Sequence, residues 1–196
     1  MDNFSNFKKN IARFVDLTPE EEEYLVSKVK VAHVKRRQFI VQPDYICKYK
    51  SYIVTGCFRA YLVDNNGHEH TITLSVEDWW ISDFYSYFHN EPSLLFVEAL
   101  EDSILVRMDH AIEDDLLAKI PKMEIYFKIL TMRALAFLQK RILVNLSNTA
   151  EERYQFFAEK YPHLLQRVPQ HMIASYLGMT TQFLSKIRNK AAKKKR

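Results

Sequence analysis

The chain is 196 residues long, a length that predicts one or two domains. Hydrophobic residues make up 47% of it and charged residues 27%, the mixture of an ordinary globular protein. No apolar run approaches the roughly 20 residues that a transmembrane helix needs, and the N-terminus lacks the apolar core of a secretion signal. We therefore expect a cytoplasmic protein that contacts no membrane. Its two cysteines, Cys47 and Cys57, are expected to be reduced thiols and are too few to hold an iron–sulfur cluster.

The first 30 residues are expected to be helical. Thr18 is a good N-cap, Pro19 suits the first helical position, and Glu20 and Glu21 carry negative charge near the positive end of the helix dipole. This combination predicts that a helix begins at Pro19.

From Val31 to Met108, short runs rich in Val, Ile, Tyr and Phe alternate with turn residues and predict β-strands. The segment Asp64–Gly67 is a hairpin turn signal, because Asn and Gly accept positive φ angles. Several short strands at this spacing predict an antiparallel sandwich or barrel. The runs expected to be strands are 51–56, 57–63, 68–74, 96–100 and 103–107.

A short helix is predicted from Asp109 to Ile120, and Pro121 is expected to open a long helix that ends near Leu146. A helix of about 25 residues spans nearly 40 Å, more than a small domain covers by itself. The apolar stripe of this helix indicates pairing with a second copy of the chain, and the alternative is a helix that lies flat on its own β domain. The residues expected in the dimer seam are Phe127, Leu130, Ala134, Phe137, Leu138 and Ile142.

The net charge of +4 conceals a strong asymmetry along the chain. Nine of the 28 basic residues follow Glu159, where no Asp or Glu occurs, so the first 159 residues hold 19 basic and all 24 acidic residues. A basic end on an acidic chain indicates a polyanionic partner, although a solvated basic tail has the same composition.

The segment from Val168 to Lys190 has the pattern of a helix-turn-helix. Ala174 is the small residue expected where the two helices cross, and Gly178 is the turn glycine, where positive φ costs little. Thr180 is placed to cap the second helix. The residues expected to fill the small core are Ile173, Leu177, Met179, Leu184 and Ile187.

The second helix of this motif is expected to enter the major groove of double-stranded DNA. Gln182 can bond adenine, Lys186 can donate to guanine, and hydroxyl groups can bond bases or phosphates. Phe183 can touch a thymine methyl group, but packing against the preceding helix is the expected role. Arg188, Lys190 and the basic tail are better placed for phosphates. The DNA-binding residues are predicted to be Thr180, Thr181, Gln182, Ser185, Lys186, Arg188, Lys190 and His171.

Nearly the whole chain resembles the Crp–Fnr (catabolite activator and fumarate–nitrate regulator) family of bacterial transcription factors. The resemblance implies an N-terminal cyclic-nucleotide-binding-like sensor, a homodimer on a two-fold symmetric DNA site, and RNA polymerase as a further partner. The segments that carry it are 52–56, 58–61, 64–67, 77–83, 98–105 and 167–178. Because the chain ends soon after Lys190, the β wing that usually follows the reader helix in the family is expected to be absent.

The sequence departs from the family members that bind cyclic AMP. Those members carry Gly-Glu and then Arg-Ser or Arg-Thr in the phosphate-binding cassette, whereas this chain reads Ser82-Asp83 and then Pro92–Leu95, with no arginine. A buried phosphate without its cation is costly, so we expect the effector to be another small molecule or to be absent. The candidate effector-pocket residues are Trp79, Trp80, Ser82, Asp83 and Ser93, although both tryptophans also suit a plain sandwich core.

Other candidate sites are weaker. His68 and His70 alternate along a predicted strand, but no third ligand is near in sequence, so we expect solvent-facing residues and no metal site. No nucleophile motif, Gly-rich phosphate loop or carboxylate pair indicates an enzyme, and we expect no cofactor and no catalytic residue.

The sequence thus predicts an α+β protein with a double-stranded, jelly-roll-like β roll, a long dimerisation helix and a C-terminal helix-turn-helix. The expected boundaries are 1–120 for the sensor domain, 121–146 for the dimerisation helix and 147–196 for the DNA-binding domain. The predicted function is sequence-specific transcription regulation. The alternative is a small-molecule-binding regulatory protein with a degenerate sensor and no sequence-specific role on DNA.

Overall fold

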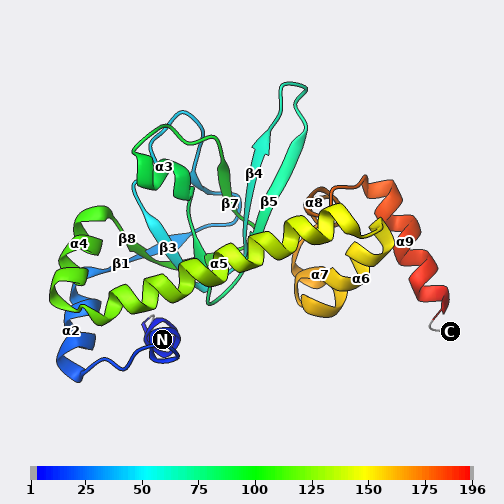
Figure 1. Ribbon diagram of the computed structural model, residues 1–196. Coiled ribbons are helices and arrows are strands. Elements are labelled where there is room, and N and C mark those ends of the chain that lie inside the picture. Colours follow the sequence, from blue (N-terminus) through cyan, green and yellow to red (C-terminus); the bar gives the residue numbers. More distant parts are fainter. Residues whose placement is uncertain (1–3, 195–196) are drawn as a thin grey trace. The chain divides into compact units, whose positions relative to one another are not determined.

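The computed structural model describes residues 4–194, with side chains as far as Lys190. Contacts divide the described residues into two compact units. The β unit holds the residues up to Ala60 together with Leu74–Ala134, and the helical unit holds Tyr61–Thr73 together with the residues from Leu135 on. The predicted α+β architecture, with a β roll, a long helix and C-terminal helices, is confirmed (Figure 1).

Within residues 4–194 the strands form two four-stranded sheets, the faces of the predicted β roll. One has the order β1-β8-β3-β6 and the other β2-β7-β4-β5, and the pairing of β8 with both β1 and β3 is antiparallel. The strands are β1 (Lys30–Val34), β2 (Phe39–Val41), β3 (Lys50–Thr55), β4 (Phe58–Val63), β5 (Glu69–Ser75), β6 (Trp80–Ile81), β7 (Phe96–Ala99) and β8 (Ser103–Met108).

The first sheet is covered on both faces, which explains why β3 is buried almost throughout. Side chains alternate along a strand, so Ile53 belongs to the core between the sheets, while Tyr52 and Val54 belong to a second core with the helices. On β8, Leu105 and Val106 divide between the same two cores. The β unit therefore has a sandwich core and a helix-covered core that share one sheet.

The helices of the β unit begin at well-defined caps. The Thr18 hydroxyl accepts the N–H of Glu21, and the Glu21 carboxylate accepts the N–H of Thr18, which completes the predicted start at Pro19. Asp109 caps the next predicted helix by accepting the N–H of Ile112. These helices are α1 (Ser5–Ala12), α2 (Pro19–Lys28), α3 (Phe84–His89) and α4 (His110–Lys119).

Helix α3 is absent from the sequence prediction. Its sequence, Phe-Tyr-Ser-Tyr-Phe-His, is aromatic and strand-like in composition, but its ends are strongly capped. The Asp83 carboxylate accepts the N–H of Ser86, and Asn90 ends the helix in the left-handed conformation at φ 55°. Capping at both ends thus overrides the composition of this segment.

Helix α5 (Lys122–Ser147) is continuous from the β unit into the helical unit, close to the predicted bounds (Figure 1). In its first half Met123 and Tyr126 are fully buried in the helix-covered core, and Phe127 and Leu130 pack against that core. This half lies on its own β unit, as the alternative interpretation of the helix expected.

The helical unit contains the hairpin tip of β4 and β5 and the C-terminal helices. The Asp64–Gly67 turn is confirmed, with the Gly67 N–H donating to the Asp64 carbonyl at 2.9 Å and Gly67 at φ 81°. The association of this tip with the C-terminal helices is not indicated by the sequence. Those helices are α6 (Ala150–Lys160), α7 (Leu164–Arg167), α8 (Gln170–Tyr176) and α9 (Thr181–Lys194).

Among residues 4–194, no helix is both long enough and apolar enough to cross a lipid bilayer.

Candidate nucleic-acid interface

The C-terminal helices are held together by a small apolar core. Phe157 of α6 and Leu164 of α7 are buried with residues of the last two helices. Of the five predicted core residues, Ile173, Leu177, Leu184 and Ile187 are buried, whereas Met179 is only half-buried because it lies in the turn. Ala174 is also buried, at 1% exposed, as expected where two helices approach closely.

The turn between α8 and α9 has the predicted backbone conformation. Gly178 has φ +66°, which favours glycine, and its N–H donates to the Ser175 carbonyl at 3.1 Å. The Met179 N–H donates to the Ala174 carbonyl at 3.0 Å, and the Thr180 hydroxyl accepts the N–H of Phe183 at 3.2 Å. These bonds fix the angle at which α9 leaves the turn.

Helix α9 presents polar and basic side chains to solvent. Of the predicted reader residues, Thr180, Thr181, Gln182, Lys186, Arg188 and Lys190 are exposed, as is His171 on α8, and Ser185 is half-buried. Phe183 is 46% exposed, so neighbouring residues cover only about half of it. The side chains of residues 191–194, and residues 195 and 196, lie outside the described part, so the basic tail is not placed.

One predicted phosphate contact is already paired. The Lys190 ammonium lies 2.8 Å from the Glu151 carboxylate of α6. Both side chains are more than half exposed, and such surface pairs contribute only up to about 1 kcal/mol. A phosphate can therefore replace Glu151 at little cost.

The helical unit also carries a contact that the sequence does not indicate. The Ser175 hydroxyl of α8 donates to the Glu69 carbonyl at 2.7 Å and accepts the N–H of Thr71 at 2.9 Å. The Arg141 guanidinium donates to the carbonyls of Ile72, Thr71 and Tyr176. The hairpin tip is thereby bonded to the first helix of the helix-turn-helix.

The candidate effector residues lie in the β unit, where their polar groups are bonded to other residues of that unit. The Ser93 hydroxyl, 1% exposed, donates to the Asp83 carboxylate at 2.6 Å. The Ser82 hydroxyl donates to the Tyr49 carbonyl at 3.0 Å. Trp80 packs against Phe7, Tyr52 and Phe127, and its indole N–H donates to the Tyr126 hydroxyl at 3.0 Å. Trp79 packs against the sandwich core.

The two weak histidine candidates both follow the hairpin turn in sequence. His70 Nε2 lies 2.8 Å and His68 Nδ1 3.5 Å from the Asp64 carboxylate, and both imidazoles are mostly exposed. Only His70 belongs to β5, because the strand begins at Glu69. In residues 4–194 no group of three or more His, Cys, Asp and Glu residues has the geometry of a metal site.

Comparison with known proteins shows the fold. No family model matches the chain, and no curated protein matches it. Among solved structures, FixK2 from Bradyrhizobium japonicum matches with 17% identity and a TM-score of 0.72 over 85% of each chain. A putative Crp/Fnr-family transcriptional regulator from Eubacterium rectale matches with 14% identity over 95% of this chain and 86% of its own, with a TM-score of 0.65. The catabolite activator protein of Thermus thermophilus matches with 19% identity over 91% of this chain and 85% of its own, with a TM-score of 0.55. The chain therefore has the fold of Crp/Fnr regulators, which confirms the predicted resemblance.

Proposed function

We propose that the chain is a homodimeric transcription regulator of the Crp–Fnr type that binds specific DNA sequences through α9. The observation that carries the proposal is the ordered α8–Gly178–α9 turn with a row of exposed polar and basic side chains on α9. Solved structures with this fold include transcription regulators, and we propose no catalytic role for the chain. RNA polymerase remains a proposed partner, by analogy with the family.

The proposed contacts divide into two kinds. Gln182, Ser185 and Lys186 follow the N-terminus of α9, the part of a reader helix that faces base edges, and they supply sequence choice. His171, Arg188 and Lys190 are proposed to bind phosphates, which adds affinity without specificity.

A selection of binding sites from random double-stranded oligonucleotides tests this proposal. We expect an enriched palindrome whose half-sites lie about one helical turn of DNA apart. The variant Gln182→Ala should weaken binding to that site by about 1–3 kcal/mol and relax the preference at one base pair. The matched control Gln155→Ala, on the exposed face of α6, should leave the preference unchanged. The absence of any enriched sequence would support the alternative of a small-molecule-binding protein with no sequence-specific role on DNA.

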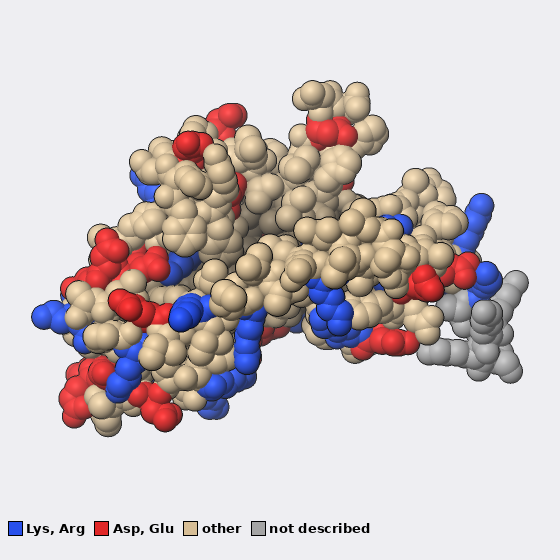
Figure 2. Space-filling model, viewed as in Figure 1, with Lys and Arg blue, Asp and Glu red and all other residues tan. Residues whose placement is uncertain are grey.

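The second copy is proposed to bind along α5. Several large apolar side chains of this helix are exposed, and they form one stripe in which most successive members are three, four or seven residues apart. Figure 2 shows the surface over α5 as largely free of charged side chains on the face drawn. The stripe consists of Ile125, Met132, Leu135, Leu138, Ile142, Leu143 and Leu146, which are 45–81% exposed.

The proposed stripe differs from the seam predicted from sequence. Leu138 and Ile142 are exposed within it, and Ala134 is exposed at its edge. Phe127 and Leu130 instead pack against the core of the β unit, and Phe137 lines a pocket of the helical unit. Sequence periodicity identified the helix, but contacts within the chain decide which face is left for a partner.

Sedimentation analysis of two variants tests the seam. Leu135→Glu places a charge in an interface that would otherwise be dry, so we expect a monomer at concentrations where the unchanged chain is a dimer. Leu94→Glu is the matched control, because Leu94 is 75% exposed in the β unit and lies outside the stripe. A dimer that persists in Leu135→Glu would exclude α5 as the seam.

Cyclic AMP is proposed not to be the effector. The Asp83 carboxylate caps α3 through the N–H of Ser86 and accepts the Ser93 hydroxyl, and a ribose hydroxyl would have to compete with these bonds. Isothermal titration of the full chain with cyclic AMP should show no heat of binding, and a saturable heat would overturn this part of the proposal.

A further inference from the structure

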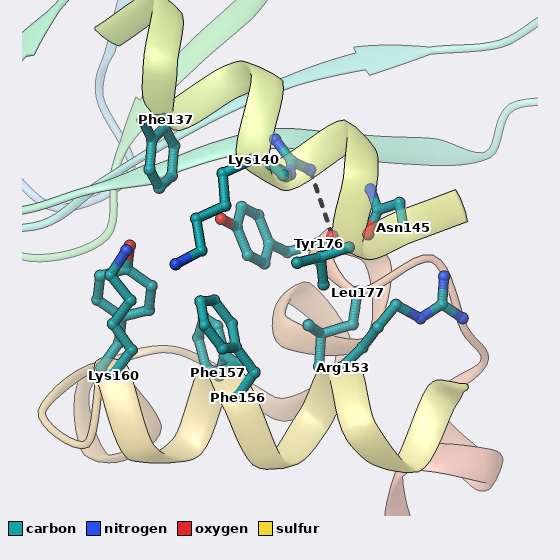
Figure 3. Close-up of a pocket in the computed structure, with 12 residues that line it drawn as sticks. Phe137, Lys140, Asn145, Arg153, Phe156, Phe157, Lys160, Tyr176 and Leu177 are labelled. Carbon is teal, nitrogen blue, oxygen red and sulfur yellow. Dashed lines mark hydrogen bonds between the residues drawn. The ribbon is translucent and has the colours of Figure 1, made fainter. Parts of the chain in front are cut away.

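The helical unit contains a pocket that the proposed function does not use. It has a volume of about 450 Å³ with its open mouth included, and α5, α6 and α8 line it. Figure 3 shows Lys140 extending from α5 toward Phe156 and Phe157 of α6, with Phe137 and Lys160 at the same end.

The wall of the pocket is aromatic and its charges are all positive. Phe137, Phe156 and Tyr176 supply flat apolar faces. The Lys140 ammonium lies 5.2 Å from the ring centroid of Phe156, and the Lys160 ammonium 5.5 Å from those of both Phe137 and Phe156. The Arg141 guanidinium lies 4.2 Å from the ring centroid of Tyr176. Such geometry suits cation–π attraction, and Lys140 and Lys160 also remain exposed to solvent.

The compensating charge is missing from the lining. Among the described residues that line the pocket there is no Asp or Glu, and the Arg141 guanidinium donates only to neutral carbonyl groups. Burial lowers the pKa of Arg141, which shows that its charge is held in the unit at a cost. Cations that gather without an acid repel one another, and a bound anion relieves that repulsion.

We propose that this pocket binds a small organic anion in which a flat apolar ring carries one acidic group. The ring packs among Phe137, Phe156 and Tyr176, and the acidic group pairs with Lys140 and Lys160. An inorganic anion would leave the aromatic faces unused, and a neutral ring would leave the cations unpaired.

The position of the pocket would allow a bound ligand to affect α9, the helix proposed to bind DNA. Tyr176 and Leu177 both line it and directly precede Gly178, the residue that sets the angle of α9. A ligand that contacts them stabilises one conformation of the turn and thereby changes DNA affinity. This consequence rests on the proposed function, whereas the binding site itself does not.

The test is a binding measurement on the full chain without DNA. The probe is 8-anilinonaphthalene-1-sulfonate, and the comparison compound is N-phenyl-1-naphthylamine, which has the same rings without the sulfonate. We expect saturable binding of the sulfonate, with an affinity about tenfold above that of the neutral compound and reduced by salt. Equal affinities for the sulfonate and the neutral compound would overturn the proposal, because they would show that the pocket binds apolar rings without recognising the anionic group.

Variants locate the site. Replacing both pocket lysines, Lys140→Gln with Lys160→Gln, should weaken the sulfonate about tenfold and leave the neutral compound unchanged. The double control Lys186→Gln with Arg188→Gln removes the same charge from α9 and should change neither affinity. Loss of probe binding in Leu135→Glu, together with full binding in the pocket variant, would assign the probe to the α5 stripe and overturn the proposal. Because no DNA is present, failure here is distinct from failure of the proposed DNA binding.

Discussion

The ammonium group of Lys50 and the carboxylate of Glu113 form an ion pair inside the β unit, where Lys50 is only 4% exposed. The Tyr87 hydroxyl donates to the second oxygen of that carboxylate at 2.9 Å. The Lys50 ammonium also lies 3.5 Å from the ring centroid of Phe127 on α5. Burial lowers the pKa of Lys50 more than the carboxylate raises it, so the pair ties β3 to α4 at the cost of desolvating a cation.

Removing the carboxylate of Glu113 alone should therefore destabilise the fold severely. Glu113→Ala leaves the Lys50 ammonium buried without a counter-charge, and we expect a loss of about 3–5 kcal/mol in the free energy of unfolding. Urea denaturation followed by circular dichroism measures this loss. The double variant Lys50→Met with Glu113→Leu removes both charges and should recover most of the loss. A small effect of Glu113→Ala would contradict the structural importance of the pair.

Replacing each of two glycines with positive φ by alanine should cost different amounts of stability. At Gly56 an added Cβ would lie 2.0 Å from the Ser103 hydroxyl oxygen, and the backbone has φ +120°. At Gly178 the nearest atom, Nη1 of Arg153, is 3.8 Å away, so only the backbone conformation opposes the change. We expect Gly178→Ala to cost about 1–2 kcal/mol and Gly56→Ala clearly more, because overpacking adds to the conformational cost. Thermal unfolding of the two variants measures which of them is destabilised more. Equal destabilisation would refute the expected difference.

The hairpin turn should depend on pH through Asp64. Its carboxylate accepts a hydrogen bond from His70 and the N–H groups of His68 and Asn66, and these bonds hold the pKa of Asp64 well below its ordinary value of 3.8. A carboxyl group with a lowered pKa stabilises the folded turn at pH values above its unfolded pKa. That stabilisation is lost as the pH falls through the folded pKa.

Nuclear magnetic resonance of the Asn66 and His68 amides measures this dependence. We expect their shifts to titrate with a midpoint below 3.8. In Asp64→Asn the same shifts should be insensitive to acid pH. A midpoint at or above 3.8 would show that the bonds do not favour the ionised form.

Ser175 should hold the hairpin tip to α8. Ser175→Ala removes both the bond to the Glu69 carbonyl and the bond from the Thr71 N–H, and we expect a loss of about 1–3 kcal/mol within the helical unit. Faster hydrogen exchange at the Thr71 amide is the direct measurement. Ser147→Ala is the control, because the Ser147 hydroxyl bonds only within α5 and to its neighbour Asn148. Unchanged exchange at Thr71 in Ser175→Ala would mean that other contacts hold the tip.

Local chemistry made the elements predictable. The caps at Thr18 and Asp109, the turn glycine Gly178 and the Asp64–Gly67 turn all act over a few neighbouring residues, so their signals are complete in the sequence. Helix α3 escaped prediction because its aromatic composition favours a strand, and only its caps indicate a helix.

The tertiary structure decided which faces are covered. Phe137 and Leu138 are adjacent on α5 and equally apolar, yet one lines the aromatic pocket and the other is 45% exposed. Ser175 and Thr71 are 104 residues apart, and nothing local to either predicts their bond. The sequence by itself determined most of the helices and strands and the helix-turn-helix pattern, because these depend on short-range periodicity and capping. The α5 stripe, the bonded hairpin tip and the cationic pocket arise only when distant segments pack, because burial is a property of the neighbours that a side chain meets in space.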